Sequence, residues 1–161
     1  MHFFDDWRSI LLSMSEGNRQ RKKDWLSRYK RNRLAVLRLK GKVQEIDNRM
    51  NTVKTSHLSG MPRGGQTKTI ADYVAEKSEL ESRINKLDLK GREFRREILD
   101  AIDNMEEVVQ AEILELLFIS GLTLEAISDE LGYNVRHTYR LYAKALDSIE
   151  IPVIEDSITL K

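Results

Sequence analysis

Two arginines, a histidine and a lysine lie close together in the segment VRHTYRLYAK at positions 135–144. An arginine fork can donate two hydrogen bonds to O6 and N7 of guanine, and an α-helix fits the major groove of duplex DNA. We therefore predict that Arg136, His137 and Arg140 contact base edges. Three further residues are expected to contact phosphates: Asn134, Tyr139 and Lys144.

A helix, a tight turn and a second helix must position these side chains. Thr123 is a candidate N-cap of the first helix, and Gly132 is a candidate C-terminal stop. Asn134 is a candidate N-cap of the second helix, which carries the basic residues outward. Apolar residues at helical spacing mark the buried face of the first helix: Leu124, Ile127 and Leu131. The inner face of the second helix is expected to hold Thr138, Leu141, Ala145 and Leu146.

The segment from Val108 to Leu146 resembles region 4 of bacterial sigma factors. It is similar to the C-terminal helix-turn-helix of small phage regulators of the ArpU and RinA kind. The runs ISGLTLEAISDELGY and NVRHTYRLYAKAL carry this resemblance, and the loop LSGMPRGG resembles one in streptococcal and lactococcal phage proteins. The resemblance implies a phage-encoded transcriptional regulator of late or lysogeny genes that acts with host RNA polymerase. His137 and Thr138 stand where region 4 proteins commonly have Arg and Val, so base preferences cannot be carried over.

Apolar residues at alternating steps of three and four predict two long helices, from Asn18 to about Thr52 and from about Ile70 onward. Residues 55–69 form a Gly- and Pro-containing loop between them. Residues 18–103 are therefore expected to form an antiparallel coiled-coil hairpin, and its narrow core favours a homodimer. The predicted dimer and coiled-coil seam is Trp25, Tyr29, Asn32, Val36, Leu39, Val43, Ile46, Met50, Leu80, Ile84, Leu87, Phe94 and Ile98.

Charge is unevenly distributed along the sequence. Residues 19–42 contain 11 Lys or Arg and one acid, whereas residues 104–147 contain 3 bases and 8 acids. The basic stretch is expected to follow a phosphate backbone, although a solvated helix face remains an alternative. The acidity of residues 104–147 leaves three readings open: acids facing away from DNA, a role beside RNA polymerase, or a protein-binding module. The predicted auxiliary basic patch is Arg19, Arg21, Lys22, Lys23, Arg28, Lys30, Arg31 and Arg33.

The remaining segments complete the predicted domain organisation. Residues 1–17 are expected to form a short amphipathic helix, either packed on the protein or docking a partner, that ends at a break at Gly17–Asn18. The pattern Asn104-Met-Glu-Glu107 resembles a capping box and predicts a helix over residues 105–120, within a DNA-binding domain at 104–147. Residues 148–161 are expected to be a tail, partly tucked against that domain or forming an edge strand.

Composition narrows the possible chemistry. The sequence contains no cysteine and only 3 histidines, which are far apart, so disulfides, thiol catalysis and a metal site are not expected. No group of acids or nucleophiles has catalytic spacing, so we expect neither an enzyme nor a cofactor. No apolar run approaches the roughly 20 residues of a membrane span. We therefore expect no membrane association and a cytoplasmic location in the host cell, associated with the nucleoid.

The combined prediction is an all-α protein with a long antiparallel coiled-coil hairpin followed by a C-terminal helix-turn-helix domain. Its expected function is sequence-specific binding of double-stranded DNA in transcription regulation. One alternative is a DNA-packaging subunit like the small terminase subunits, which also combine DNA-binding helices with coiled coil. The other is an antirepressor or inhibitor that binds a protein partner through the same fold.

Overall fold

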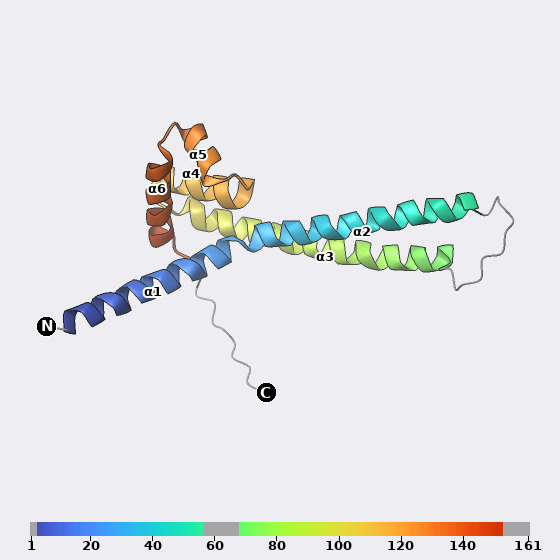
Figure 1. The fold of residues 1–161 in the computed structure, drawn as a ribbon, viewed down its shortest axis with the longest axis horizontal. Coiled ribbons are helices and arrows are strands. Elements are labelled where there is room, and N and C mark those ends of the chain that lie inside the picture. The colour runs from blue at the N-terminus through green and yellow to red at the C-terminus, as the bar shows by residue number, and fades with distance from the viewer. Residues whose placement is uncertain (1–2, 57–67, 153–161) are drawn as a thin grey trace. The chain divides into compact units, whose positions relative to one another are not determined.

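The predicted all-α class is confirmed over the described part of the chain. A computed structural model describes the backbone of residues 3–56 and 68–152, and the side chains of residues 15–52 and 68–152. Within these ranges there is no strand. The elements, shown in Figure 1, are α1 (Phe3–Leu26), α2 (Arg28–Ser56), α3 (Ile70–Asp103), α4 (Val108–Glu115), the π-helix η2 (Leu116–Ser120), α5 (Leu124–Leu131) and α6 (Val135–Ser148).

The chain divides into two compact units. The first comprises residues 1–30 and 94–161, and the second comprises residues 31–93. This division differs from the predicted domain boundaries after residues 17, 103 and 147. The end of α1 and the last turns of α3 pack with the C-terminal helices, because they contribute buried apolar side chains to the same core.

The core of the first unit is built from segments far apart in the sequence. Trp25 and Leu26 of α1 are buried together with Ile98 and Ile102 of α3. They share this core with the following residues of the C-terminal elements: Leu114, Phe118, Ile119, Ala145, Leu146 and Ile149. Because burial of a large apolar side chain contributes roughly 1.5–3 kcal/mol, these contacts make α1 an integral part of the unit.

The second unit consists of the α2 and α3 segments between Arg31 and Glu93, which pack antiparallel. Asn32 lies against Gly91, where a Cβ would come within 2.6 Å of the Asn32 Oδ1 atom, and the Lys77 ammonium donates to Asp47 at 2.7 Å. The N-terminal part of α2 thus packs against the C-terminal part of α3. The shared apolar core consists of Val36, Leu39 and Ile84, flanked by Val43, Leu80 and Leu87.

The predicted seam is divided between the two cores. Ile46 is buried and Met50 is half-buried in the second unit. Trp25, Tyr29 and Ile98, however, lie in or against the core of the first unit, so their placement in one continuous seam was wrong. Phe94 also belongs to the first unit, where the Arg28 guanidinium stacks on its ring at 4.7 Å. Heptad spacing identifies a buried face but not the helices that cover it.

The helix break is at Ser27 and not at Gly17–Asn18, because α1 runs without interruption from Phe3 to Leu26. A glycine inside a helix costs only about 0.5–1 kcal/mol, which is too little to end it by itself. The side chains of residues 1–14 lie outside the described residues, so the predicted amphipathic face falls there. Most of the predicted loop, residues 57–67, and the end of the tail, residues 153–161, also lie outside them.

The predicted capping box at Asn104 is not formed. The Asn104 amide instead donates to the carbonyl of Asp100 at 2.8 Å, near the C-terminal end of α3. The next helix, α4, begins at Val108, and its N-cap residue Glu107 makes no side-chain capping bond. The amide therefore satisfies a carbonyl that the end of α3 leaves without a helical partner. Gly121, with φ +82°, follows the last residue of η2.

Candidate nucleic-acid interface

Helices α5 and α6 have the N-caps predicted from the sequence. The Thr123 hydroxyl accepts the Ala126 N–H at 3.2 Å, and the Asn134 side chain accepts the Arg136 N–H at 2.8 Å. Gly132 follows α5 with φ +68°, a left-handed conformation that favours glycine. These local bonds set the start of each helix, and so they determine which residues of α6 face inward.

Three residues on one side of α6 anchor it to the first unit. Thr138 and Ala145 are fully buried, and Leu146 is 1% exposed. The Thr138 hydroxyl donates to the Asn134 carbonyl at 3.4 Å, which satisfies its polar atom inside the domain. Because these positions face the core, the opposite side of α6 presents Arg136, Arg140 and Lys144 to solvent, in a row with steps of four residues.

His137 lies beside this row and supports one of its arginines. The imidazole Nδ1 is 2.9 Å from Nη2 of Arg140. Because a guanidinium can only donate, Nδ1 is the acceptor in this contact. The ring is half-buried and makes an edge contact with Tyr133 at 5.2 Å between centroids. In this arrangement His137 positions Arg140, whereas the sequence predicted a direct base contact.

Tyr139 is engaged by a carboxylate of the preceding helix. Its hydroxyl donates to Oε1 of Glu125 at 2.9 Å. This hydrogen bond raises the pKa of the Tyr139 phenol. The pKa of Glu125 is lowered, first by its own backbone N–H and then by Tyr139. A phosphate contact by Tyr139, as predicted from the sequence, would have to compete with this carboxylate.

Half of the predicted basic patch binds groups of the protein itself. Arg19 donates through Nε to Asp147 at 2.6 Å, and the buried Lys22 donates to the Asp147 carbonyl at 2.9 Å. Burial lowers the pKa of Lys22. Arg28 pairs with Glu97 at 2.7 Å. Two cations also lie over aromatic rings: Lys23 over Tyr142, and Arg28 over Trp25.

The other four residues of this patch do not form one surface within a single unit. Arg21 and Lys30 are exposed in the first unit, whereas Arg31 and Arg33 are exposed in the second. Phosphate binding by these exposed cations stays a prediction. Half of the charges of the patch bind groups of the first unit, because α1 and the start of α2 belong to that unit.

The Arg19–Asp147 pair predicts a pH-dependent contribution to stability. The hydrogen bond from Arg19 lowers the pKa of Asp147, so its contribution is present above the unfolded pKa of about 3.9 and is lost as pH falls through the folded pKa. Both side chains are well exposed, at 38% and 50%, so Asp147→Asn should lower the free energy of unfolding by at most about 1 kcal/mol at neutral pH.

Urea unfolding of Asp147→Asn and the unchanged protein at a series of pH values measures this effect. The difference should shrink towards zero in acid. Asp129→Asn, at an exposed position of α5, is the matched control. A difference that persists unchanged below the folded pKa would show that the asparagine acts through packing and not through the charge.

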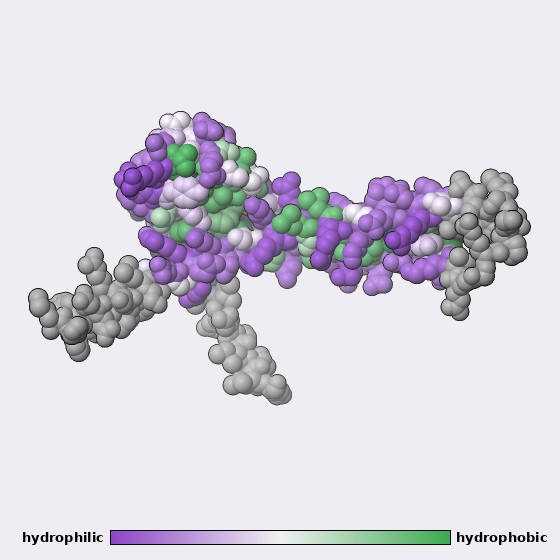
Figure 2. Space-filling view, viewed as in Figure 1, coloured by the Kyte–Doolittle hydropathy of each residue, from purple (hydrophilic) through white to green (hydrophobic). Residues whose placement is uncertain are grey.

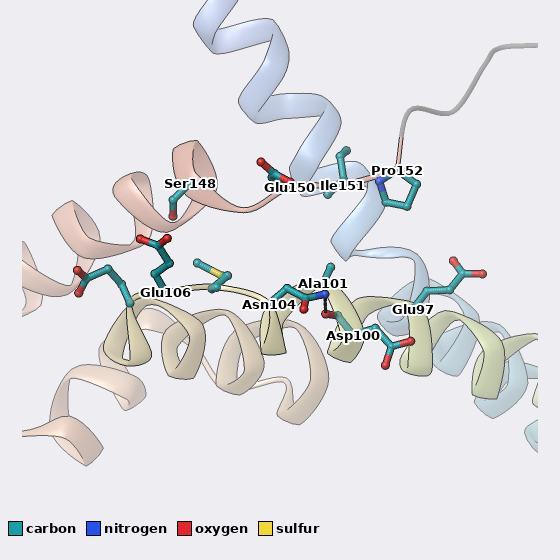
Figure 3. A pocket seen from close by; sticks show the side chains of 11 residues that line it. Glu97, Asp100, Ala101, Asn104, Glu106, Ser148, Glu150, Ile151 and Pro152 are labelled. Carbon is teal, nitrogen blue, oxygen red and sulfur yellow. Dashed lines mark hydrogen bonds between the residues drawn. The ribbon is translucent and has the colours of Figure 1, made fainter.

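A pocket of about 780 Å³ opens at another part of the first unit (Figure 3). Met105, Ala101 and Ile151 give it an apolar part, and Figure 3 shows Asn104 next to Ala101, bonded to the Asp100 carbonyl. Its carboxylates come from α3, the α3–α4 turn and the segment after α6: Glu97, Asp100, Glu106, Glu107 and Glu150. This concentration of negative charge repels phosphate, so the pocket is not part of a nucleic-acid surface.

Two residues of this region were not predicted from the sequence. Glu125 binds Tyr139 across the turn, and their spacing of 14 residues has no simple helical signal. Asp147 binds Arg19 over a separation of 128 residues, which no local pattern could indicate. In the described part of the chain, no group of His, Cys, Asp or Glu has the arrangement of a metal site. No helix there is long and apolar enough to cross a membrane.

Comparisons of the chain with protein-family models, with curated proteins and with solved structures gave no match. The candidate interface is therefore described by its own residues: the solvent side of α6, its supporting histidine, and the N-termini of α5 and α6.

Proposed function

We propose that this chain is a sequence-specific, double-stranded-DNA-binding transcription regulator in which α5, the turn and α6 act as a helix-turn-helix. The observation that carries the proposal is the row of Arg136, Arg140 and Lys144 on the solvent side of α6, opposite a fully buried inner face. At 14 residues, α6 has a length of roughly 21 Å and can lie in a major groove.

Each part of the interface has a distinct role in this proposal. Arg136 and Arg140 pair with guanine through their forks, and His137 holds Arg140 in position. Lys144 contacts a phosphate. The N-termini of α5 and α6, at Thr123 and Asn134, offer backbone amides to further phosphates, as helix N-termini do for anions generally.

Two features answer the objection that residues 104–147 are acidic. Asp147, on α6, is paired with Arg19, which offsets its charge. The acidic pocket lies at the C-terminal end of α6, where Ser148 lines it. At 1.5 Å per residue, Ser148 is about 18 Å along the helix from Arg136. The interface offers only a few cations to phosphates. We therefore expect its affinity for DNA to depend less steeply on salt concentration than that of a strongly basic DNA-binding domain.

The resemblance of residues 108–146 to sigma-factor region 4 and to ArpU and RinA regulators supports a phage-encoded regulator that acts beside host RNA polymerase. In this proposal the paired α2 and α3 segments form a coiled-coil arm. Their shared apolar core, with Val36, Leu39 and Ile84 at heptad spacing, supports that assignment.

Sequencing of genomic fragments retained by the purified chain tests the proposal. Enrichment of one intergenic site is the expected result. Equal recovery of all fragments would contradict sequence-specific binding. Recovery of no fragment at any salt concentration would contradict a DNA-binding function altogether.

A further inference from the structure

The outer side of α2 carries a stripe without charge. The stripe consists of Leu34, Leu37, Gly41, Gln44 and Asn48, at alternating steps of three and four, and all five are exposed. Of the 29 residues of α2, 11 are charged, and none of these lies on the stripe. The inner face of α2, with Val36 and Leu39, is already used by α3. This second heptad row is therefore available to another molecule.

Two leucines give this stripe an apolar end. Leu34 is 58% exposed and Leu37 is 55% exposed, among the highest exposures of large apolar side chains in the described residues. Figure 2 shows hydrophobic surface over the first half of α2, on a hairpin whose visible face is mostly hydrophilic. Exposed leucines at i and i+3 on one helix row form the kind of surface that a second helix covers.

Gly41, at the centre of the stripe, has no function in the packing of its own chain. No heavy atom lies within 4 Å of a Cβ placed there, in contrast to Gly91, whose Cβ would strike Asn32. A glycine at an exposed helix position lowers helix stability by about 1 kcal/mol relative to alanine. The benefit of a missing Cβ is close approach of another backbone, and none of the described residues of the chain supplies one on this side of α2.

The charges that flank the stripe are complementary in an antiparallel pair of α2 helices. When Gly41 faces the partner's Gln44, and Leu37 faces the partner's Asn48, Arg38 lies next to the partner's Glu45. On the other flank Lys40 lies next to the partner's Asp47, a carboxylate that also accepts from Lys77 of its own chain. A parallel pair would instead place Arg33 next to the partner's Arg38. Since flanking charges set helix orientation, they favour the antiparallel pair.

We infer that the stripe from Leu34 to Asn48 on α2 is an antiparallel interface with a second copy of this chain. This inference extends the proposed function, because a dimer presents two recognition helices to paired half-sites. The stripe is only about 21 Å long, and one helix crossing buries less than the roughly 800 Å² per partner of a stable interface. The expected dimer is therefore of micromolar strength and is reinforced when both copies bind DNA.

Sedimentation of the full chain without DNA tests the interface by charge exchange. Arg38→Glu and Glu45→Arg should each weaken self-association about tenfold, since each change replaces two symmetry-related attractions by repulsions. The double variant restores both pairs and should return to within about twofold of the unchanged protein. Lys86→Glu, an equal charge change at an exposed position of α3, is the control and should have no effect.

Cysteine cross-linking tests the orientation, because the chain contains no cysteine of its own. A mixture of Leu37→Cys and Asn48→Cys chains should form a mixed disulfide. Leu37→Cys alone should not, since the two sites would be about 16 Å apart in the antiparallel pair, against about 4–7 Å for bridged Cα atoms. Efficient bridging of two Leu37→Cys chains would overturn the antiparallel interface.

The outcome for the interface is separable from the outcome for DNA binding. A chain that stays monomeric at every concentration, or whose double charge variant fails to recover, contradicts the interface even if it binds DNA. A dimer that behaves as expected but binds no DNA supports the interface and contradicts the proposed function instead.

Discussion

Replacing Arg136 and Arg140 together by alanine should lower the affinity of the chain for its specific DNA site by about 100-fold or more. Each bidentate arginine–guanine pair contributes roughly 1–3 kcal/mol of discrimination, and every 1.4 kcal/mol corresponds to a factor of ten. The free energy of unfolding should change little, because both side chains are exposed on α6 and the inner face remains intact. Fluorescence anisotropy with the enriched fragment and a scrambled fragment measures the effect.

The chain offers a matched control for this experiment. Arg92 and Arg96 are also exposed arginines four residues apart, but they lie on α3. The Arg92→Ala/Arg96→Ala variant loses the same charge and should keep the specific affinity. Lys144→Ala should weaken binding to both fragments by a similar factor, as a phosphate contact does. If the α3 variant and the α6 variant lose affinity equally, the effect is one of net charge and α6 does not read bases.

The largest expected effect on stability comes from α1. Trp25→Ala should lower the free energy of unfolding of the first unit by about 3–5 kcal/mol, since it removes a ring that is 3% exposed and leaves a cavity beside Leu26, Ile98 and Ile102. Arg28 would also lose the ring on which it stacks at 4.5 Å. Urea unfolding followed by circular dichroism measures the change.

Leu89→Ala provides the comparison, because Leu89 is 59% exposed on α3 and should contribute less than about 0.5 kcal/mol. The result also distinguishes two placements of Trp25: the coiled-coil seam predicted from the sequence and the core of the first unit. Its place in the core of the first unit predicts that Trp25→Ala lowers the free energy of unfolding of the unit that contains α6, the helix that carries Arg136 and Arg140. A variant as stable as the Leu89→Ala protein would contradict this place.

Features that depend on near neighbours could be predicted from the sequence. The caps at Thr123 and Asn134 and the stop at Gly132 involve groups within a few residues, so residue type and spacing determine them. The inner face of α6 follows for the same reason, since helical periodicity places Thr138 and Ala145 on one side. The all-α class and the row of basic residues on α6 therefore follow from residue type and spacing alone.

Features that depend on distant partners could not be predicted. The periodicity of Trp25 and Ile98 matched the seam, yet both side chains pack with the C-terminal helices, because a buried face does not specify what covers it. Arg19 and Lys22 resembled members of a nucleic-acid surface, but both bind Asp147, more than 120 residues away. A charged side chain pairs with an opposite charge that the fold brings close to it, and its neighbours in the sequence do not reveal that partner.

The sequence by itself determined the helices, their caps and the side of α6 that carries the basic residues, because these arise from hydrogen bonds and periodicity within a few residues. Only the tertiary structure decided which cations remain available to a ligand. Arg136 and Arg140 stay exposed on α6, whereas Arg19, Lys22 and Arg28 bind groups of the first unit. The physical reason is that packing α1 and the start of α2 into the first unit brings these cations within hydrogen-bonding distance of acceptors that lie far away along the chain.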